Sequence, residues 1–414
     1  MLQKYKLGEL VDVARGASLS GDYYSTKGEY IRLTCGNFDY RNNCFKENTS
    51  KDNLFYAGAF KAEFLLEKGD IITPLTEQAI GLLGTTARIP ESGKYIQSQD
   101  IALIKCKVGK IDPTFCYYLI PSRLVRDQLS AAAQQTKIRH TSPDKIKDCT
   151  VWIPDLDDQK AIGRLLASLD EKIQLNKRIN DNLEAMAKQL YDYWFVQFDF
   201  PNEEGKPYKS SGGAMVWNEK LKRMIPQGWN NGILSDVANI TMGQSPDGSS
   251  YNELGEGSIF YQGSTDFGLR FPSIRQYTTS PNRCANKGDI LMSVRAPVGA
   301  LNIANNDCCI GRGLSALSSK IGSITHLYYL MNDFRLKFEG MNSAGTTFGS
   351  ITKDELFNLP VVIPTKSVIS ELEKVCEPIF DKQMIIGEEI NVLTKQRNEL
   401  LPLLMNGQAT VNSD

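Results

Sequence analysis

Two carboxylates and a lysine have the order of a metal-dependent nuclease site. Asp144 follows a proline, and Asp158 and Lys160 come later in the chain, as in the pattern PD…(D/E)-x-K. In such a site the carboxylates and the lysine converge on Mg²⁺ from a pair of strands. Here Asp158 and Lys160 begin a long predicted helix, beyond a strand that ends at Pro154. We do not expect them to meet Asp144, and a stand-alone Mg²⁺-dependent nuclease is kept only as an alternative.

Other catalytic motifs are absent from the sequence. It contains no G-x-G-x-x-G cofactor loop, no P-loop and no Asn/Asp-Pro-Pro-aromatic motif of adenine methylation. The two histidines, His140 and His326, leave little material for histidine-based catalysis. The nine cysteines are scattered without a C-x-x-C pair, which is typical of reduced thiols and excludes structural zinc. We therefore expect no catalytic residue, no metal site and no cofactor in this chain.

Arginine, amide and hydroxyl side chains in three places have the chemistry of DNA recognition. Arg295 and Arg312 could each donate two hydrogen bonds to guanine or hold phosphates; a structural ion pair near a sheet edge is the alternative. Two polar loops offer donors suited to base edges and phosphates, with a solvated loop as the alternative. The candidate loop residues are Gln134, Gln135, Thr136, Lys137 and Arg139 in the first loop, and Thr346 and Thr347 in the second.

The charge of the chain permits double-stranded DNA as a partner without demonstrating it. The 414 residues include 47 Lys and Arg against 48 Asp and Glu, a net charge of −1. Basic residues slightly outnumber acidic ones in residues 1–155 and 220–364. The first residues lack an apolar signal segment, and no long uncharged apolar run follows. We expect a cytoplasmic protein that does not enter a membrane.

The candidate residues belong to a sequence that repeats itself, and the repeat identifies the elements that must position them. Each copy contains short strand-like apolar runs and one helical stretch. We therefore expect two α+β domains with long loops. The matching pieces are 7–13 with 233–238, 68–71 with 287–290, and 135–154 with 345–364.

Each α+β block is followed by a long helical segment. In residues 156–200 and 365–406, apolar residues recur at alternating steps of four and three, the pattern of a coiled-coil seam. Because a domain lies between the two segments, an antiparallel helix pair is the simplest way to bury both seams. A helix of about 40 residues would be roughly 60 Å long. The candidate residues for a helix-pair or partner interface are Leu183, Leu190, Trp194, Ile386, Ile390 and Leu393.

The predicted organisation has six parts. They are a first domain at 1–155, a helix at 156–200, a linker at 201–224, a second domain at 225–364, a helix at 365–406 and a tail at 407–414. Aromatic residues are concentrated in residues 191–200, at the end of the first helix. They either pack where this helix meets a domain or form a docking surface for a partner.

This arrangement resembles the specificity (S) subunit of type I restriction–modification enzymes, over the full length of the chain. The first domain departs from the second, because Thr76 and Gln99 stand where the second has Arg295 and Arg312. The matching motifs are Pro154-x-Leu156-x-x-Gln159-x-x-Ile162-x-x-x-Leu166-x-x-Leu169-Asp170-x-x-Ile173, Ile225-Pro226-x-Gly228-Trp229, Lys287-Gly288-Asp289-Ile290, Ser293-Val294-Arg295-Ala296-Pro297-Val298-Gly299 and Gly311-Arg312-Gly313-Leu314.

The resemblance implies a non-catalytic subunit with two target-recognition domains and two spacer helices. Such a subunit would bind a bipartite, interrupted DNA sequence and recruit two adenine-N6 methyltransferase subunits, with motor-nuclease subunits in the full complex. S-adenosylmethionine, ATP and Mg²⁺ would then belong to the partner subunits. A scaffold that binds other proteins through its two domains is a further alternative.

Overall fold

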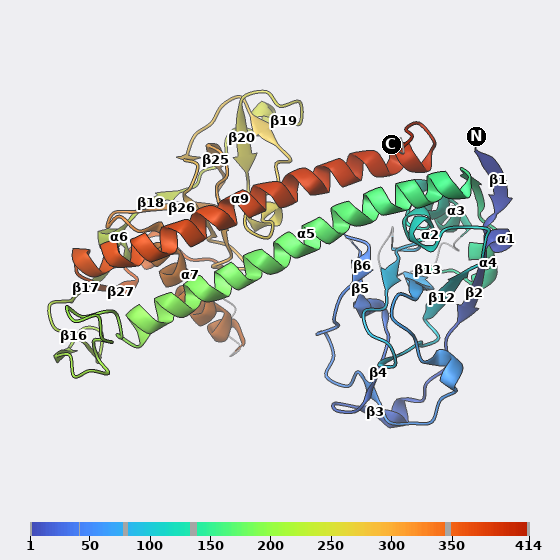
Figure 1. The fold of residues 1–414 in the computed structure, drawn as a ribbon. Helices are drawn as coiled ribbons and strands as arrows, with labels where there is room; N and C mark the ends of the chain where they lie inside the picture. The colour runs from blue at the N-terminus through green and yellow to red at the C-terminus, as the bar shows by residue number, and fades with distance from the viewer. Residues whose placement is uncertain (1, 41, 78–81, 133–138, 344–348, 412–414) are drawn as a thin grey trace. The chain divides into compact units, whose positions relative to one another are not determined.

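The structure is a computed structural model that describes residues 2–40, 42–77, 82–132, 139–343 and 349–411. It divides into two compact units (Figure 1). Unit 1 consists of Met1–Gln174 and Val392–Asp414, and unit 2 consists of Leu175–Asn391. Among the described residues, none of the helices combines the length and apolarity needed to cross a bilayer.

Unit 1 is built around an antiparallel sheet with the strand order β10-β8-β12-β2. The central strand β12 is an apolar run whose first four side chains are all buried, as expected for a strand covered on both faces. Helices α2 and α3 follow it and contribute to the same core. The bounds are β2 Val11–Arg15, β8 Ile71–Pro74, β10 Ala87–Arg88, β12 Ile101–Cys106, α2 Pro113–Leu119 and α3 Arg123–Ala132.

A second sheet of unit 1 has the order β11-β4-β7-β3, in which β11 and β4 are parallel. Three two-stranded pairs complete the unit: β1 with β14, β5 with β6, and β9 with β13. The remaining bounds are β1 Gln3–Lys6, α1 Leu7–Leu10, β3 Tyr24–Ser25, β4 Tyr30–Arg32, β5 Phe38–Asp39, β6 Cys44–Phe45, β7 Phe55–Tyr56, β9 Thr76–Glu77, β11 Tyr95–Ile96, β13 Arg139–His140, α4 Pro143–Lys147 and β14 Thr150–Ile153.

Unit 2 repeats this plan with the sheets β18-β26-β23-β24 and β19-β21-β20-β25-β22, and with the pairs β17–β27 and β15–β16. Its bounds are β15 Met215–Asn218, β16 Arg223–Pro226, β17 Asn230–Ile233, α6 Leu234–Val237, β18 Ala238–Met242, β19 Tyr251–Asn252, β20 Ser258–Tyr261, β21 Tyr277–Thr278, β22 Cys284–Ala285, β23 Ile290–Ser293, β24 Leu301–Ile303, β25 Cys308–Ile310, β26 Leu314–Ser319, α7 Ile324–Ser343, α8 Lys353–Phe357 and β27 Pro360–Ile363.

The duplicated α+β fold predicted from the sequence is confirmed, and the strand registers refine the alignment of the two copies. Ile101 pairs with Pro74 in unit 1, as Leu314 pairs with Ser293 in unit 2. The short helices α1 and α6 correspond residue for residue, so Leu7 matches Leu234. The sequence comparison placed Leu7 against Ile233, one residue too early.

The two long helices are α5, Leu156–Tyr191, and α9, Lys366–Met405. Within each unit they lie side by side and run in opposite directions (Figure 1). In unit 1 the Arg397 guanidinium lies 2.8 Å from the Asp170 carboxylate. In unit 2 the Asn176 amide donates to Glu389 and the Gln383 amide donates to Glu184, both at 2.9 Å.

The candidate interface residues of the helices are largely inaccessible. Trp194, Ile386, Ile390 and Leu393 are buried, whereas Leu183 and Leu190 are half-buried. The polar seam residues Asn176, Asn180 and Gln383 are buried as well. Polar residues at such positions fix the register of a helix pair.

The first long helix ends before residue 200, where the sequence placed its end. A π-helical turn, Asp192–Val196, follows α5, and Phe198 then adopts a left-handed conformation with a φ of 68°. The Asp199 N–H donates to the Tyr193 carbonyl at 2.9 Å, a bond that closes a helix end of this kind. The ring of Phe198 packs edge-on against Trp229 at 5.6 Å, which offsets the strain.

The aromatic residues at this helix end form a core. Five of them are buried together with Trp229, Tyr329 and the first turns of α9. Of the six aromatics at 191–200, Tyr193 is the exposed one, at 36%. Packing of the helix against its domain therefore accounts for five of these six aromatic residues.

The predicted linker at 201–224 contains ordered structure. Strands β15 and β16 form an antiparallel hairpin in which Met215 pairs with Pro226. Before the hairpin, the Tyr208 ring stacks on Phe200 at 4.6 Å. The glycine and serine residues at 210–213 turn the chain between these two features.

Candidate nucleic-acid interface

Arg295 and Arg312 lie just beyond the ends of two neighbouring strands, β23 and β26, of the central sheet of unit 2. Ser293 of β23 pairs with Leu314 of β26, and the Val294 N–H donates to the Gly313 carbonyl at 2.9 Å. The same antiparallel register, continued by one more pair, puts Arg295 opposite Arg312. The strand pairing therefore brings together two arginines that are distant in the sequence.

The glycines on either side of Arg312 allow a neighbouring segment to pass close to it. A Cβ atom on Gly313 would lie 2.7 Å from the Gln262 carbonyl oxygen, and one on Gly311 would lie 3.0 Å from the Gln262 Cα. Backbone atoms cannot yield to such contacts, so glycine is required at Gly313 and strongly favoured at Gly311. The segment after β20 is thereby placed beside Arg312.

These segments enclose an open hollow of about 280 Å³, called here the arginine hollow. It is lined by Gln262, Gly263, Ser264, Thr265, Asp266, Arg275, Arg295, Ala296, Arg312 and Gly313. Arg295 and Arg312 are exposed. Within the part of the chain that the structure describes, neither guanidinium forms an ion pair or a side-chain hydrogen bond. The structural ion pair considered for them is thus not observed there.

Arg275 is the third arginine of the hollow, and sequence reasoning missed it. Its Nε donates to Asp266 Oδ1 at 2.5 Å, and its Nη2 forms an ion pair with the same oxygen. Asp266 is buried, with 6% of its side chain exposed, whereas Arg275 is 61% exposed. One sequence feature could have pointed to this part of the hollow. The run Gln262-Gly263-Ser264-Thr265, which follows a strand, has the same polar composition as the two candidate loops.

The second candidate loop ends beside Arg295. Thr346 and Thr347 lie outside the described residues. Directly after them, Ser350 forms a β-bridge with Arg295, and the Ala296 N–H donates to the Gly349 carbonyl at 3.1 Å. The Ile351 N–H donates to the Val294 carbonyl at 2.9 Å. The loop is therefore anchored at the edge of the arginine hollow.

The first candidate loop ends at the equivalent place in unit 1. Gln134, Gln135, Thr136 and Lys137 lie outside the described residues. The next strand, β13, pairs with β9, so that Arg139 lies opposite Glu77 and His140 opposite Thr76. Since Thr76 corresponds to Arg295, the two loops end at matching positions of the two sheets.

Unit 1 presents different side chains on this shared backbone. The register of β8 and β12 brings Thr76 towards Gln99, in the places of Arg295 and Arg312. The Cys35 thiol lies 3.1 Å from the Thr76 hydroxyl, and burial raises the pKa of this thiol, so it stays neutral. Gln99 is exposed. Unit 1 thus offers amide, hydroxyl and thiol groups where unit 2 offers guanidinium groups.

The buried aspartate of the hollow also has a counterpart in unit 1. The parallel pairs β4–β11 and β20–β25 align the 3₁₀ turn Cys35–Asn37 with Ser264–Asp266. Asn37 therefore takes the place of Asp266. Its side chain accepts from the Thr34 N–H at 2.9 Å, so this position caps a turn in unit 1 and holds an arginine in unit 2.

The nuclease alternative is not favoured by the geometry. Asp144 lies on α4, where Lys147 pairs with it at 2.7 Å, and Lys160 pairs with Asp157 at 3.1 Å in the first turn of α5. The N–H of Asp158 is capped by Asp155 at 3.0 Å. Among the residues described, no group of three or more His, Cys, Asp or Glu side chains could hold a metal ion.

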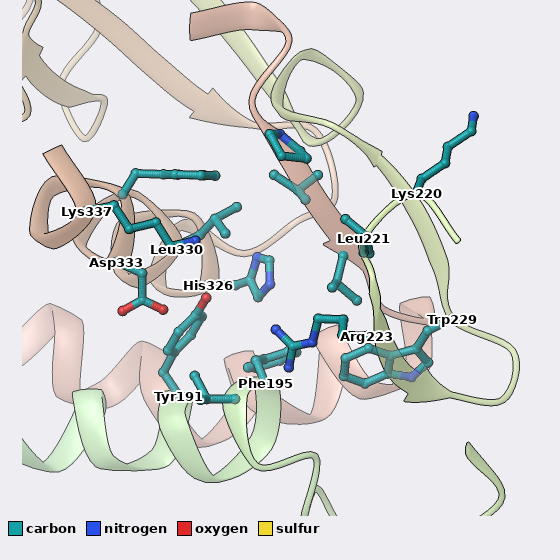
Figure 2. A pocket seen from close by; sticks show the side chains of 15 residues that line it. Tyr191, Phe195, Lys220, Leu221, Arg223, Trp229, His326, Leu330, Asp333 and Lys337 are labelled. Carbon is teal, nitrogen blue, oxygen red and sulfur yellow. The ribbon is translucent and has the colours of Figure 1, made fainter. Parts of the chain in front are cut away.

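A pocket of about 250 Å³ in unit 2 is lined in part by the buried His326 (Figure 2). Figure 2 shows His326 near its centre, with Tyr191 and Phe195 on one side and Leu221 on another. The ring packs edge-on against Phe195 at 4.6 Å, and burial lowers the pKa of His326 to about 4. His326 is therefore neutral at pH 7, and its surroundings are those of a core residue.

Comparisons with known proteins agree with this arrangement. Residues 2–185 and 226–400 match the family described as "Type I restriction modification DNA specificity domain". A Methanocaldococcus jannaschii protein that carries the name of a type I restriction enzyme MjaX specificity subunit is 30% identical over 366 residues, which cover 85% of this chain and 81% of the relative. The Haemophilus influenzae HindI specificity subunit is 21% identical, with 76% and 81% covered.

A solved structure shares the fold. The crystal structure of a type I restriction-modification S subunit from M. genitalium aligns with a TM-score of 0.63 and 16% sequence identity. The alignment covers 98% of this chain and 96% of that chain.

Proposed function

Because the chain belongs to the family of type I restriction–modification specificity subunits, which are non-catalytic DNA-recognition components, we propose that each of its domains reads one half of a bipartite, interrupted DNA target. The observation that supports this most is a shared backbone with exchanged side chains. When the strand registers are extended beyond the strand ends, Thr76 and Gln99 in unit 1 correspond to Arg295 and Arg312 in unit 2. Side chains of different hydrogen-bonding type select different bases.

We further propose that α5 and α9 set the gap between the half-sites and dock two adenine-N6 methyltransferase subunits. A second set of apolar side chains, on α5 and the π-helical turn that follows it, supports the docking. Leu175, Ile179, Met186 and Tyr193 recur at helical spacing and are 36–53% exposed, so they are not used by the seam with α9. Leu190, Met186 and Tyr193 also line a surface hollow of about 850 Å³ at the end of α5.

The chemistry of the complex would then belong to its other subunits. We propose that S-adenosylmethionine is bound by the methyltransferase partners, and that ATP and Mg²⁺ act on motor-nuclease partners that join the full complex. The complex would work in the cytoplasm, where its DNA is found. This chain would supply sequence recognition and assembly.

The test is co-expression of the chain with its cognate methyltransferase, followed by mapping of adenine methylation. We expect methylation at two short sequences separated by a fixed gap, and none when either protein is omitted. Methylation without a bipartite consensus would contradict the proposal, as would S-adenosylmethionine-dependent activity of the purified chain alone. Incubation of the chain alone with duplex DNA and Mg²⁺ tests the nuclease alternative, and we expect no cleavage.

A further inference from the structure

The ion pair of Arg275 and Asp266 fixes a guanidinium at the mouth of the arginine hollow. Arginine has five N–H donors, and Asp266 Oδ1 engages the one on Nε and one of the two on Nη2. Within the described residues the second N–H of Nη2 and both of Nη1 have no partner, so this edge of the guanidinium can donate outwards from a side chain that is 61% exposed. A carboxylate that holds one edge of a guanidinium fixes the plane in which the other edge can bind.

The loop that carries both residues is anchored at each end. At its base the Ser273 N–H donates to the Asp266 carbonyl at 2.7 Å. At its tip Arg270 lies 3.0 Å from Glu184 of α5, and Phe271 is buried against Gly387 of α9, where a Cβ atom would lie 2.4 Å from its ring. The loop that carries Arg275 is thus packed against both long helices of unit 2.

The charge balance of the hollow distinguishes the three arginines. The charge of Arg275 is neutralised by Asp266, so this pair gains little from the general attraction between cations and phosphates. Its free, oriented N–H groups still suit the O6 and N7 acceptors of guanine, which require two donors in a fixed plane. Arg295 and Arg312 have no such acidic partner among the described residues, and they keep their full charge for phosphates or bases.

We propose that Arg275 reads a guanine in the half-site of the second domain, with Asp266 as the positioning residue that orients it. This inference rests on the proposed function, because it presumes that unit 2 faces DNA. It adds the class of base that one half-site must contain and the residue that selects it. In unit 1, where Asn37 replaces Asp266, we expect no equivalent reader.

The experiment measures binding of the full chain, assembled with co-expressed methyltransferase, to a duplex library randomised in both half-sites. Sequencing of bound and unbound DNA gives the preference at each position. We expect the wild type to favour G·C over other pairs at one position of the second half-site by roughly 5- to 150-fold. Arg275→Lys keeps the charge but loses the planar fork, so it should reduce that preference to less than about 3-fold. Asp266→Asn should weaken the preference at the same position.

Arg283→Lys is the matched control, because Arg283 is an exposed arginine of the same domain that does not line the hollow. It should leave every preference unchanged, and the first half-site reports on folding in all variants. If Arg275→Lys bound all DNA sequences with equally reduced affinity, or kept the wild-type preference, the inference would be overturned and the proposed function would stay intact. A wild-type complex without sequence preference at either half-site would instead overturn the proposed function, and this inference with it.

Discussion

Arg397 of α9 donates to Asp170 of α5 over 2.8 Å, and the Tyr118 hydroxyl of α2 donates to the other oxygen of the same carboxylate at 2.7 Å. The side chains of the pair are 11% and 26% exposed. One aspartate thus joins both long helices to the first domain within unit 1. A carboxylate held in this way links helix pairing to the stability of the domain.

Loss of this pair should destabilise the protein strongly. Arg397→Leu leaves the Asp170 charge largely buried without its partner, which should lower the free energy of unfolding by about 2–4 kcal/mol. The control is Lys395→Ala, because Lys395 and Glu399 are 3.9 Å apart and 77% and 64% exposed, a pair worth well under about 1 kcal/mol. Urea unfolding of both variants is the measurement. Equal stability of the two would mean that the Asp170 contact does not hold the helices.

Stability should fall in mildly acidic solution because of His326. Burial lowers the pKa of His326 to about 4, against about 6.5 in the unfolded chain, so the unfolded state binds more protons between these values. The stability contributed by the neutral ring is complete above pH 6.5 and is lost as the pH falls towards 4. The loss at pH 5 should be about 2 kcal/mol.

Thermal unfolding at pH 7.5 and pH 5.0 measures this effect. The drop in stability should be smaller in His326→Phe than in the wild type, whereas substitution of the exposed His140 by Gln should leave it unchanged. An identical drop in wild type and His326→Phe would show that other groups govern the acid sensitivity.

Arg295 and Arg312 should act on one half-site only. If either arginine donates two hydrogen bonds to a base, its replacement by Ala should reduce the binding free energy that favours the preferred base by about 1–3 kcal/mol, at one position of the second half-site. An equal loss of affinity for all DNA sequences, together with a shallower dependence of affinity on salt, would identify a phosphate contact instead. Binding to duplexes varied one base pair at a time separates these results. Altered preference in the first half-site would contradict the assignment of one half-site to each domain.

The sequence predicted the fold better than the details of the site. The spacing of apolar residues predicts both long helices, because burial of a seam depends on that spacing alone. The juxtaposition of Arg295 and Arg312 follows from the repeat only once the strand register is known. The pair of Asp266 and Arg275 could not be predicted, since it closes a loop whose tip is positioned by contacts with Glu184 and Gly387.

Two errors at element boundaries have a similar cause. The first long helix ends early because the aromatic core around Trp229 stabilises Phe198 in a left-handed conformation, which local sequence does not signal. The hairpin of β15 and β16 was missed because the glycine and serine residues before it are typical of a flexible linker. Tertiary contacts outweighed local propensity in both places.

Matched insertions in the two helices test whether they set the gap between the half-sites. Asn180 lies midway between Asn176 and Glu184, whose partners on α9 are Glu389 and Gln383, so the opposing position is Ile386. Four residues inserted after Asn180 and four beside Ile386 lengthen the helix pair by about 6 Å and rotate one end by roughly 40° beyond a full turn. Insertion of two residues in each helix instead rotates the following part of the apolar seam by about 200° and turns it to solvent.

The decisive measurement is adenine methylation mapping of these variants with the co-expressed methyltransferase. Since one base pair of B-DNA advances about 3.4 Å, the four-residue variant should methylate a target whose gap is longer by about one or two base pairs, with both half-site sequences unchanged. The two-residue variant should be inactive. A four-residue variant that keeps the original gap at full activity, or a two-residue variant that behaves like it, would contradict the account of two reading domains spaced by paired helices.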